Sequence, residues 1–231
     1  MESRIIVALD YSNADDALVL AHKLDPAWCR LKVGLELYVS AGPAIVETLS
    51  GLGFDVFLDL KFHDIPNTVA KACKAAANTG AWMINVHSLG GERMMAAARE
   101  AVEACTHKPL LIAVTILTSH ADEELTKIGL SGSAAESVVR LAGHAQQAGL
   151  DGVVCSPHEA SVLRQQLGDE FLLVTPGVRP AGSDTGDQRR IMTPEQTLAA
   201  GSSYLVIGRP ITQAENPAAR AKEITQACLP A

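Results

Sequence analysis

Charged side chains stand at the ends of several short apolar segments of this sequence. Asp10 follows one such segment, Lys32 lies in a second, and Asp59 and Lys61 end a third. A lysine held between carboxylates can stabilise negative charge that develops on a bound molecule, because the carboxylates fix its ammonium group in place. Interlocked charges of this kind are typical of sites adapted to chemistry. These four residues are therefore the first candidates for a catalytic site.

The alternation of side chains along the third segment, DVFLDLK, indicates where its charges point. Successive side chains of a strand face opposite sides, so Phe57, Asp59 and Lys61 share one face, while the apolar face should meet helices. An ordinary ion pair at a strand end would explain Asp59 and Lys61 alone. It does not explain why Asp10 and Lys32 end neighbouring strands in a compatible phase. We therefore favour a charge cluster that points into the interior.

The elements that must position these residues repeat along the chain. Short apolar runs alternate with Ala- and Leu-rich segments of helical spacing, and eight such units in 231 residues leave about 29 residues each. This length suits a strand, a helix and two loops, which predicts a (β/α)8 TIM barrel over residues 1–231 as a single domain. A doubly wound sheet is the competitor, but its glycine-rich first turn is missing. The expected strands are Arg4–Asp10, Cys29–Val33, Asp55–Lys61, Trp82–His87, Pro109–Leu117, Gly152–Ser156, Phe171–Pro176 and Tyr204–Gly208.

Two predicted helices bear on the site. A helix over Pro66–Asn78 begins with proline near its first position, carries an apolar stripe that includes Val69 and Cys73, and stops before Gly80. The interval between the fifth and sixth strands is the longest, and it predicts an extra short helix before the main one. In a parallel barrel, catalytic groups belong at the C-terminal ends of the strands and in the loops that follow.

Composition excludes several classes of protein. The chain has 19 Lys and Arg against 26 Asp and Glu, a net charge of −7, which argues against a general nucleic-acid partner. No apolar stretch reaches about 18 residues and the first residues do not resemble a signal peptide, so no membrane partner is expected. The five cysteines are scattered, without a disulfide or zinc pattern. These features predict a cytoplasmic protein without a metal site.

The run DLKFHDIPNT at Asp59–Thr68 resembles the D-x-K-x-x-D-I-P-N-T signature of the orotidine 5'-phosphate decarboxylase family, in its shorter bacterial form. The resemblance extends over nearly the whole chain. Its further segments are VALD at Val7–Asp10, KVG at Lys32–Gly34, LTS at Leu117–Ser119, TPGVRP at Thr175–Pro180, DQ at Asp187–Gln188 and VIGRP at Val206–Pro210.

This resemblance implies decarboxylation of orotidine 5'-phosphate to uridine 5'-phosphate (UMP) and carbon dioxide, without metal or organic cofactor. Loss of carbon dioxide leaves a carbanion at C6 of the pyrimidine that the ring delocalises poorly. By similarity, Lys61 stabilises this charge and then donates the proton. Lys32, Asp59 and Asp64 complete a network that fixes Lys61. By the same resemblance the protein is a homodimer in which Asp64 and Thr68 reach the neighbouring subunit's site. The alternative from the sequence alone is that Asp64 caps a helix.

The same resemblance assigns the rest of the substrate. Asp10 and Lys32 would contact the ribose, together with Thr68 from across the interface, and Thr118 and Ser156 would lie near the pyrimidine. Ser156 could equally cap a helix starting at Pro157. Loops after the seventh and eighth strands often hold phosphate in such barrels. The residues expected there are Pro176, Arg179, Gln188, Gly208 and Arg209.

Two other functions remain open from the residues. A magnesium-dependent sugar-phosphate decarboxylase or aldolase of the same barrel superfamily also carries D-x-K-x-x-D. The I-P-N-T continuation, Arg179 and Gln188 favour the orotidine interpretation. A phosphoribosyl-binding protein without catalysis is the non-enzyme alternative, and the complete Lys-Asp-Lys-Asp set argues against it. His63 and His87 are interpreted as a structural residue and a polar residue at the barrel mouth, because no metal-ligand spacing includes them.

Overall fold

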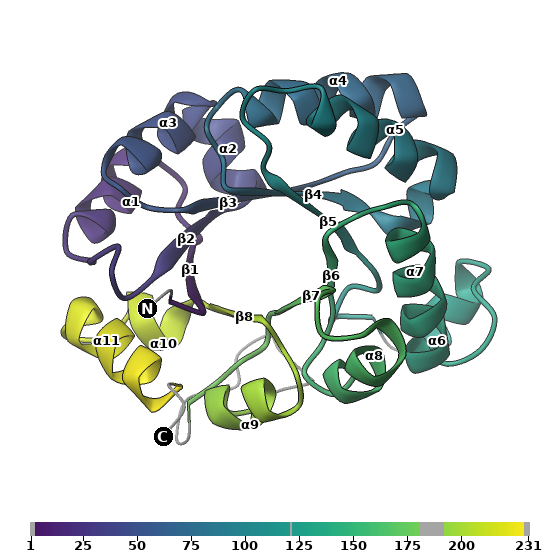
Figure 1. Ribbon diagram of the computed structural model, residues 1–231. Coiled ribbons are helices and arrows are strands. Elements are labelled where there is room, and N and C mark those ends of the chain that lie inside the picture. The colour runs from purple at the N-terminus through teal and green to yellow at the C-terminus, as the bar shows by residue number, and fades with distance from the viewer. Residues whose placement is uncertain (1–2, 121, 181–191, 229–231) are drawn as a thin grey trace.

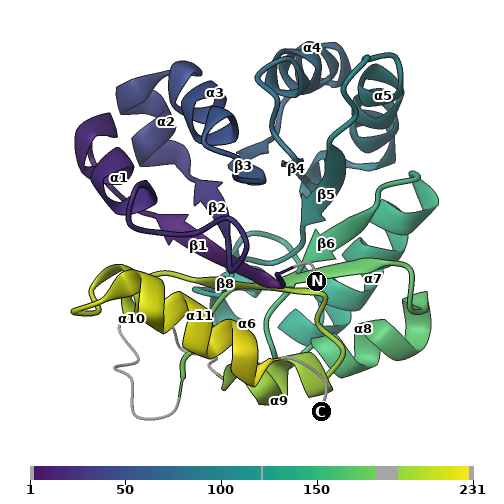
Figure 2. The same cartoon turned by 60° about the vertical axis from the view of Figure 1, so that its left-hand side comes forward.

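A computed structural model describes residues 3–120, 122–180 and 192–228 of the chain. Eight parallel strands pair in sequence order and β8 returns to β1, so the sheet closes into a barrel with helices around it (Figures 1 and 2). The predicted (β/α)8 TIM barrel is therefore confirmed, and the doubly wound sheet is excluded. The strands are β1 (Ile5–Leu9), β2 (Arg30–Val33), β3 (Val56–Phe62), β4 (Met83–His87), β5 (Leu110–Val114), β6 (Gly152–Val154), β7 (Leu172–Thr175) and β8 (Tyr204–Ile207).

The helices follow the strands in the order expected of βα units. Where two helices stand between successive strands, the second is the one that leads back to the sheet. The helices are α1 (Ala14–Ala21), α2 (Leu35–Ala41), α3 (Ala44–Gly51), α4 (Pro66–Ala77), the 3-10 turn η1 (Ser88–Gly90), α5 (Glu92–Glu103), α6 (Asp122–Lys127), α7 (Ala134–Gln147), α8 (Ala160–Leu167), α9 (Pro194–Ala199), α10 (Arg209–Thr212) and α11 (Pro217–Ala227). The short α6 before α7 is the extra helix predicted between the fifth and sixth strands.

The alternation predicted for the strands divides the core into two parts. Ile6, Ala8 and Phe57 belong to a small cluster inside the barrel, with Met83, Ile112, Val174 and Val206. The intervening residues, such as Val56 and Leu58, belong to the larger cluster between the sheet and the helices. Because Ala8 pairs with Lys32, and Lys32 with Phe57, the polar residues of β2 share the inward face.

The predicted element bounds hold closely, with one larger difference. Seven of the eight strands begin and end within two residues of their predicted bounds, but β5 ends at Val114 and not at Leu117. Its partner β6 has only three residues, and the ladder between them ends at Val114 and Val154. The Thr115 hydroxyl then donates to the Val154 carbonyl oxygen (2.8 Å), which ends the pairing. Helix α4 ends at Ala77, with Asn78 as its C-cap, and buries Val69 and Cys73 as predicted.

The N-terminal end of the barrel is closed by a group of side chains that we call the barrel floor, consisting of Arg30, Asp55, Trp82 and Tyr204. The Arg30 guanidinium carbon lies 4.5 Å from the Trp82 ring centroid and 5.1 Å from that of Tyr204. Arg30 Nε also pairs with Asp55 Oδ2 at 3.1 Å. Cation–π contacts and an ion pair therefore stabilise this buried arginine.

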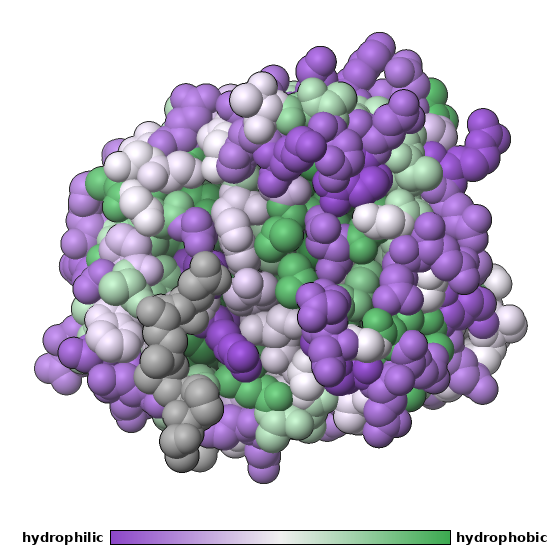
Figure 3. Space-filling view, in the orientation of Figure 1, coloured by the Kyte–Doolittle hydropathy of each residue, from purple (hydrophilic) through white to green (hydrophobic). Residues whose placement is uncertain are grey.

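The outer surface is described by its hydropathy. Seen as in Figure 1, it is mostly hydrophilic, and hydrophobic residues are exposed in scattered areas (Figure 3). Helices α10 and α11 pack against β1, where the barrel closes. Among the described residues, no helix has the length and apolar character needed to cross a membrane.

Candidate active site

Two adjoining cavities open at the C-terminal ends of the strands. The inner cavity, of about 190 Å³, is lined by Asp59, Lys61 and Thr118 together with apolar residues of β3, β5, β6, β7 and β8. The outer cavity, of about 540 Å³, is lined by Asp10, Arg179, Gly208 and Arg209 and by further residues of its loops. Lys32, Pro176 and Val206 line both. The two cavities thus form one continuous site, as expected for the mouth of such a barrel.

Four charged side chains of the site form what we call the charge cluster, consisting of Asp10, Lys32, Asp59 and Lys61. Lys61 Nζ lies 2.8 Å from Asp59 Oδ1, and Lys32 Nζ lies 3.6 Å from Asp59 Oδ2 and 3.2 Å from Asp10 Oδ1. Negative and positive groups therefore alternate along the cluster, in the order Asp10, Lys32, Asp59 and Lys61. The structure brings together the four residues that the sequence singled out first.

The environment of Asp59 explains how a carboxylate remains ionised inside the barrel. Burial alone would raise the pKa of Asp59. The charges of Lys32 and Lys61, with hydrogen bonds from Lys61 and Asn85, outweigh burial and hold the pKa of Asp59 below its ordinary value. The ionised carboxylate can then fix both ammonium groups beside the inner cavity.

The backbone at Lys61 departs from the regular strand that the sequence predicts. Lys61 has a φ of +53°, the only positive φ of a non-glycine residue in the described part of the chain. The register between β3 and β4 also shifts between Leu58 and Phe62. The side chain of Asn85 holds this irregular stretch, because its Oδ1 accepts from the Lys61 backbone N–H at 2.8 Å. Lys61 therefore reaches Asp59 from a locally bent strand.

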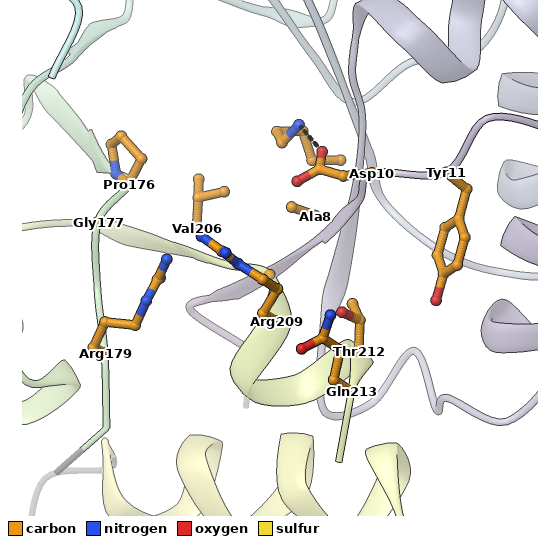
Figure 4. A pocket seen from close by; sticks show the side chains of 12 residues that line it. Ala8, Asp10, Tyr11, Pro176, Gly177, Arg179, Val206, Arg209, Thr212 and Gln213 are labelled. Atoms are coloured by element: carbon orange, nitrogen blue, oxygen red, sulfur yellow. Dashed lines mark hydrogen bonds and ion pairs between the residues drawn. The ribbon is translucent and has the colours of Figure 1, made fainter. Parts of the chain in front are cut away.

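The outer cavity is suited to an anion. The side chains of Arg179, in the loop after β7, and Arg209, at the start of α10 after β8, extend into it (Figure 4). Arg179 is buried, and its backbone N–H donates to the Met192 carbonyl oxygen at 3.0 Å, which ties the loop to a later segment. Guanidinium groups bind phosphate oxygens through several directed hydrogen bonds. Gln188, the third predicted phosphate residue, lies outside the described residues.

Two histidines stand beside the charge cluster. The His63 and His87 rings stack with centroids 5.6 Å apart, and His87 Nδ1 accepts from the Leu89 backbone N–H at 3.3 Å. Burial lowers the pKa of His87 to about 4, with further contributions from His63, Lys61 and His120. His87 is therefore neutral at neutral pH and adds no third positive charge beside Lys61.

Two predicted site residues lie outside the cavities of this chain. Asp64 and Thr68 are exposed, and neither lines the inner or the outer cavity. Asp64 Oδ1 accepts from the adjacent Ile65 N–H at 2.6 Å, and no side chain caps α4, whose N-cap is Ile65. The alternative in which Asp64 caps this helix is therefore wrong.

Ser156 is fully buried beyond the end of β6 and does not line either cavity. Its backbone N–H donates to Glu159 Oε2 at 2.7 Å, while its hydroxyl has no hydrogen-bond partner among the described residues. The expected helix at Pro157 begins instead at Ala160 with Glu159 as N-cap, so the capping alternative for Ser156 is wrong. A buried hydroxyl without a partner is unusual in a folded protein.

Similarity to known proteins identifies the family of this chain. The model of the orotidine 5'-phosphate decarboxylase / HUMPS family matches residues 3–224. The chain belongs to this family. An orotidine 5'-phosphate decarboxylase of Vibrio cholerae is 59% identical over 229 residues, covering 99% of both chains, and one of Teredinibacter turnerae is 58% identical over 221 residues, covering 96% of this chain and 95% of the relative. These findings confirm the family and the enzyme class predicted from the sequence.

The fold of the decarboxylase family is recovered as well. A crystal structure of orotidine 5'-phosphate decarboxylase from Lactobacillus acidophilus superposes with a TM-score of 0.89 at 40% identity, covering 99% of this chain and all of that one. The fold alone does not separate this family from the magnesium-dependent rival, because both belong to the same barrel superfamily. The relatives at 58–60% identity favour the orotidine interpretation, because they are named orotidine 5'-phosphate decarboxylase. In the described part of the chain, no three His, Cys, Asp or Glu side chains are grouped so that they could hold a metal ion.

Sequence reasoning missed several residues of this decarboxylase-family site. Asn85 alternates with His87 on β4, so the alternation applied to β3 would have pointed it inward. Thr212 and Gln213 line the outer cavity and follow Arg209 by three and four residues, one turn of helix away. Tyr11 lines it directly after Asp10. Each could have been found by applying the periodicity of its element beyond the matched motifs.

Proposed function

We propose that this protein decarboxylates orotidine 5'-phosphate to UMP and carbon dioxide, in the formation of pyrimidine nucleotides. The observation that carries the proposal is the pair of Lys61 and Asp59, 2.8 Å apart beside a small inner cavity that is continuous with a site for an anion. Membership of the family and the names of the relatives support the same reaction.

The chemistry needs a positive charge at one carbon atom. As the bond between C6 and the carboxylate breaks, its electron pair stays on C6 and carbon dioxide leaves. The Lys61 ammonium stabilises this charge and then donates a proton to C6, which yields UMP. In a site closed to water, such an ammonium contributes more than in solution, because its position is fixed in advance. Asp59 and Lys32 hold it in place, and the proposal includes no metal or organic cofactor.

The shapes of the two cavities support an orientation of the substrate. The pyrimidine occupies the inner cavity, with Thr118 near its polar edges, and the phosphate occupies the outer cavity. The family resemblance also assigns Ser156 to the pyrimidine, although its buried hydroxyl lines neither cavity. Arg179, Arg209 and Gln188 then bind phosphate oxygens, while Pro176 and Gly208 contribute wall and backbone. Asp10 and Lys32 lie where the cavities join, which suits the ribose hydroxyls.

The proposal includes a homodimer in which Asp64 and Thr68 act in the neighbouring subunit's site. Both are exposed, and neither lines a cavity of its own chain. Ile65, the residue that follows Asp64, is an apolar side chain that is 67% exposed. Exposed apolar side chains are typical of surfaces that a second subunit covers.

Mixing two inactive variants tests this shared site. A Lys61→Ala chain and an Asp64→Ala chain form a heterodimer with one doubly altered site and one intact site if Asp64 acts across the interface. Random assortment then restores about a quarter of the wild-type rate. No recovery after subunit exchange, or full activity of a monomer at high dilution, would contradict the shared site.

The reaction itself is tested with the purified protein by following the loss of orotidine 5'-phosphate absorbance. We expect turnover that survives EDTA and yields UMP. Absence of turnover would overturn the proposal. Activity that EDTA abolishes and Mg²⁺ restores would favour the magnesium-dependent rival, and binding of UMP without turnover would favour the phosphoribosyl-binding alternative.

The proposal treats residues 1–231 as one catalytic domain of a cytoplasmic enzyme without nucleic-acid or membrane partners. Its support is the family match over 3–224, the acidic charge balance and the five free cysteines. Free cysteines are ordinary in reducing compartments. Fractionation of cells with an antibody to the protein tests the location.

A further inference from the structure

Asn85 is a buried polar residue that the proposed chemistry does not yet use. It lies on β4 and pairs with Ile112 of β5, a member of the cluster inside the barrel, so its side chain points inward. It is fully buried and lines neither cavity. A buried amide must have hydrogen-bond partners, and those of the Asn85 side chain are both on β3.

The first partner lies where the pairing of β3 with β4 is interrupted. Leu58 pairs with Ile84, and the next pair is Phe62 with Val86. Four steps along β3 therefore correspond to two steps along β4, and the backbone between them leaves the regular ladder. The Asn85 side-chain oxygen accepts from the Lys61 N–H at 2.8 Å in this gap, which replaces a ladder bond.

This hydrogen bond acts on a strained residue. Lys61 has a φ of +53°, in the left-handed region that is unfavourable for a residue with a side chain. Such a conformation persists only when its surroundings hold it. The conformation matters here because it decides the direction in which the Lys61 side chain leaves the backbone.

The second partner is the carboxylate that Lys61 contacts. Asn85 Nδ2 donates to Asp59 Oδ1 at 2.7 Å, the same oxygen that Lys61 Nζ approaches to 2.8 Å. One carboxamide therefore bonds to Asp59 through its nitrogen and to the Lys61 backbone through its oxygen. Because an amide is planar and rigid, these two groups are held in one fixed relation.

We propose that Asn85 is a positioning residue, whose carboxamide fixes the Asp59 carboxylate and the bent backbone of Lys61 relative to each other and thereby aims the Lys61 ammonium into the inner cavity. The inference rests on the proposed decarboxylation, because it assigns Asn85 a role in that reaction. It requires no contact between Asn85 and the substrate.

An Asn85→Ser variant removes both hydrogen bonds, because the shorter serine side chain cannot reach Asp59 and the Lys61 N–H in place of the carboxamide. A misplacement of about 1 Å at a reacting group lowers rates by about 100-fold, so we expect kcat to fall by that order while KM and the affinity for UMP stay within about threefold. A crystal structure of the variant should show Lys61 Nζ moved from its position 2.8 Å from Asp59 Oδ1. An unchanged kcat, or an unchanged Lys61, would overturn the proposal.

An Asn85→Asp variant has nearly the same shape and gives a pH signature. It places a second carboxylate against Asp59, and two carboxylates in contact resist joint ionisation. At pH 8 the repulsion should lower kcat by about 100-fold relative to the wild type. As the pH falls and the pair shares one proton, the hydrogen bond returns, so the ratio of variant to wild-type kcat should rise by about tenfold. A ratio that does not change with pH would contradict the proposal.

Met83→Ala is the matched control, because Met83 lies two residues earlier on the same inward face and is fully buried. It should lower the free energy of unfolding, as large-to-small core substitutions do, yet retain kcat near the wild-type value. A 100-fold loss of kcat in this control would show that any damage to β4 suffices and would overturn the proposal.

Failure of the inference and failure of the proposed reaction are distinguishable. Wild-type turnover tests the reaction, whereas the ratios of variant to wild type and the position of Lys61 in the Asn85→Ser crystal structure test Asn85. That position can be measured even if the wild type decarboxylates nothing. If neither Asn85 variant folds, Asn85 has a structural role and the proposal is overturned.

Discussion

Strand β2 carries two inward-pointing cations, Arg30 toward the barrel floor and Lys32 toward the mouth, two residues apart. Both side chains are about a tenth exposed or less. At the floor, Arg30 stacks on Trp82 and Tyr204 and pairs with Asp55, whose side chain is half exposed. At the mouth, Lys32 lies between two carboxylates and faces both cavities.

The difference separates a charge that lines no part of the site from a charge that the proposed reaction uses. The planar guanidinium at the floor stacks on aromatic faces and pairs with Asp55, and it lines neither cavity. The ammonium at the mouth is balanced by carboxylates that also face the cavity, so a bound substrate can join the network. The same strand therefore supports two unlike environments, and substitutions at each end should have unlike effects.

The largest effect is expected at the mouth. Lys61→Ala should lower kcat by about four orders of magnitude or more, because in the proposed reaction it removes both the charge that stabilises the carbanion and the proton donor. Binding of UMP, measured by calorimetry, should remain within about tenfold. Turnover near the wild-type rate would refute the assignment of Lys61.

The same substitution at Arg30 and at Lys32 tests the comparison between floor and mouth directly. Arg30→Met should lower the free energy of unfolding by about 2 kcal/mol, because cation–π contacts and a partly buried ion pair are lost, while kcat is unchanged. Lys32→Met should lower kcat/KM by about 100-fold with a smaller effect on unfolding. Urea unfolding and initial rates measure both. Equal losses of activity in the two variants would remove the distinction between floor and mouth.

Low pH should reveal that His87, at the barrel mouth, lowers the free energy of unfolding. The pKa of His87 is lowered from 6.5 to about 4, so below pH 6.5 the unfolded chain takes up a proton that the folded chain refuses until about pH 4. Stability should therefore fall as the pH drops through this window. His87→Gln lacks this term, so its Tm should gain roughly 3–6 °C on the wild type between pH 7.5 and pH 4.5. A constant difference in Tm would show that His87 titrates normally.

The smallest effect is expected beside Lys32. A Cβ added at Gly34 would lie 3.0 Å from Lys32 Nζ, whereas one at Gly143 would meet no atom within 4 Å. Gly34→Ala should therefore shift the ammonium slightly and lower kcat/KM about threefold to tenfold. Gly143→Ala in α7 should leave the kinetics unchanged and stabilise the helix by about 0.5–1 kcal/mol. Equal kinetics in the two variants would show that Lys32 tolerates the displacement.

Sequence periodicity was sufficient to predict the barrel and the inward direction of the charges. Apolar alternation places Phe57 and Ala8 inside, and the paired register brings Lys32 beside them, so three strand ends converge. The predicted strands lie close to the observed ones because each is bounded by a local change in periodicity. The end of β5 was missed because it depends on the length of β6, a property of another segment.

The bend at Lys61 was not predictable from local sequence. Lysine does not favour a left-handed backbone, and the hydrogen bond that holds it comes from Asn85, 24 residues away. The proposed roles of Asp64 and Thr68 involve a second chain, and a single sequence carries no direct sign of which surface meets a second copy. For these two residues the prediction therefore comes from the family resemblance and not from periodicity.

The left-handed backbone at Lys61 also has a consequence for selection and design. Glycine or asparagine fits such a conformation better than lysine does, so a method that chooses residues by backbone fit alone would replace Lys61. If Lys61 acts as proposed, the resulting barrel would be easier to fold and chemically inert. Stability and turnover would then favour different residues at this one position.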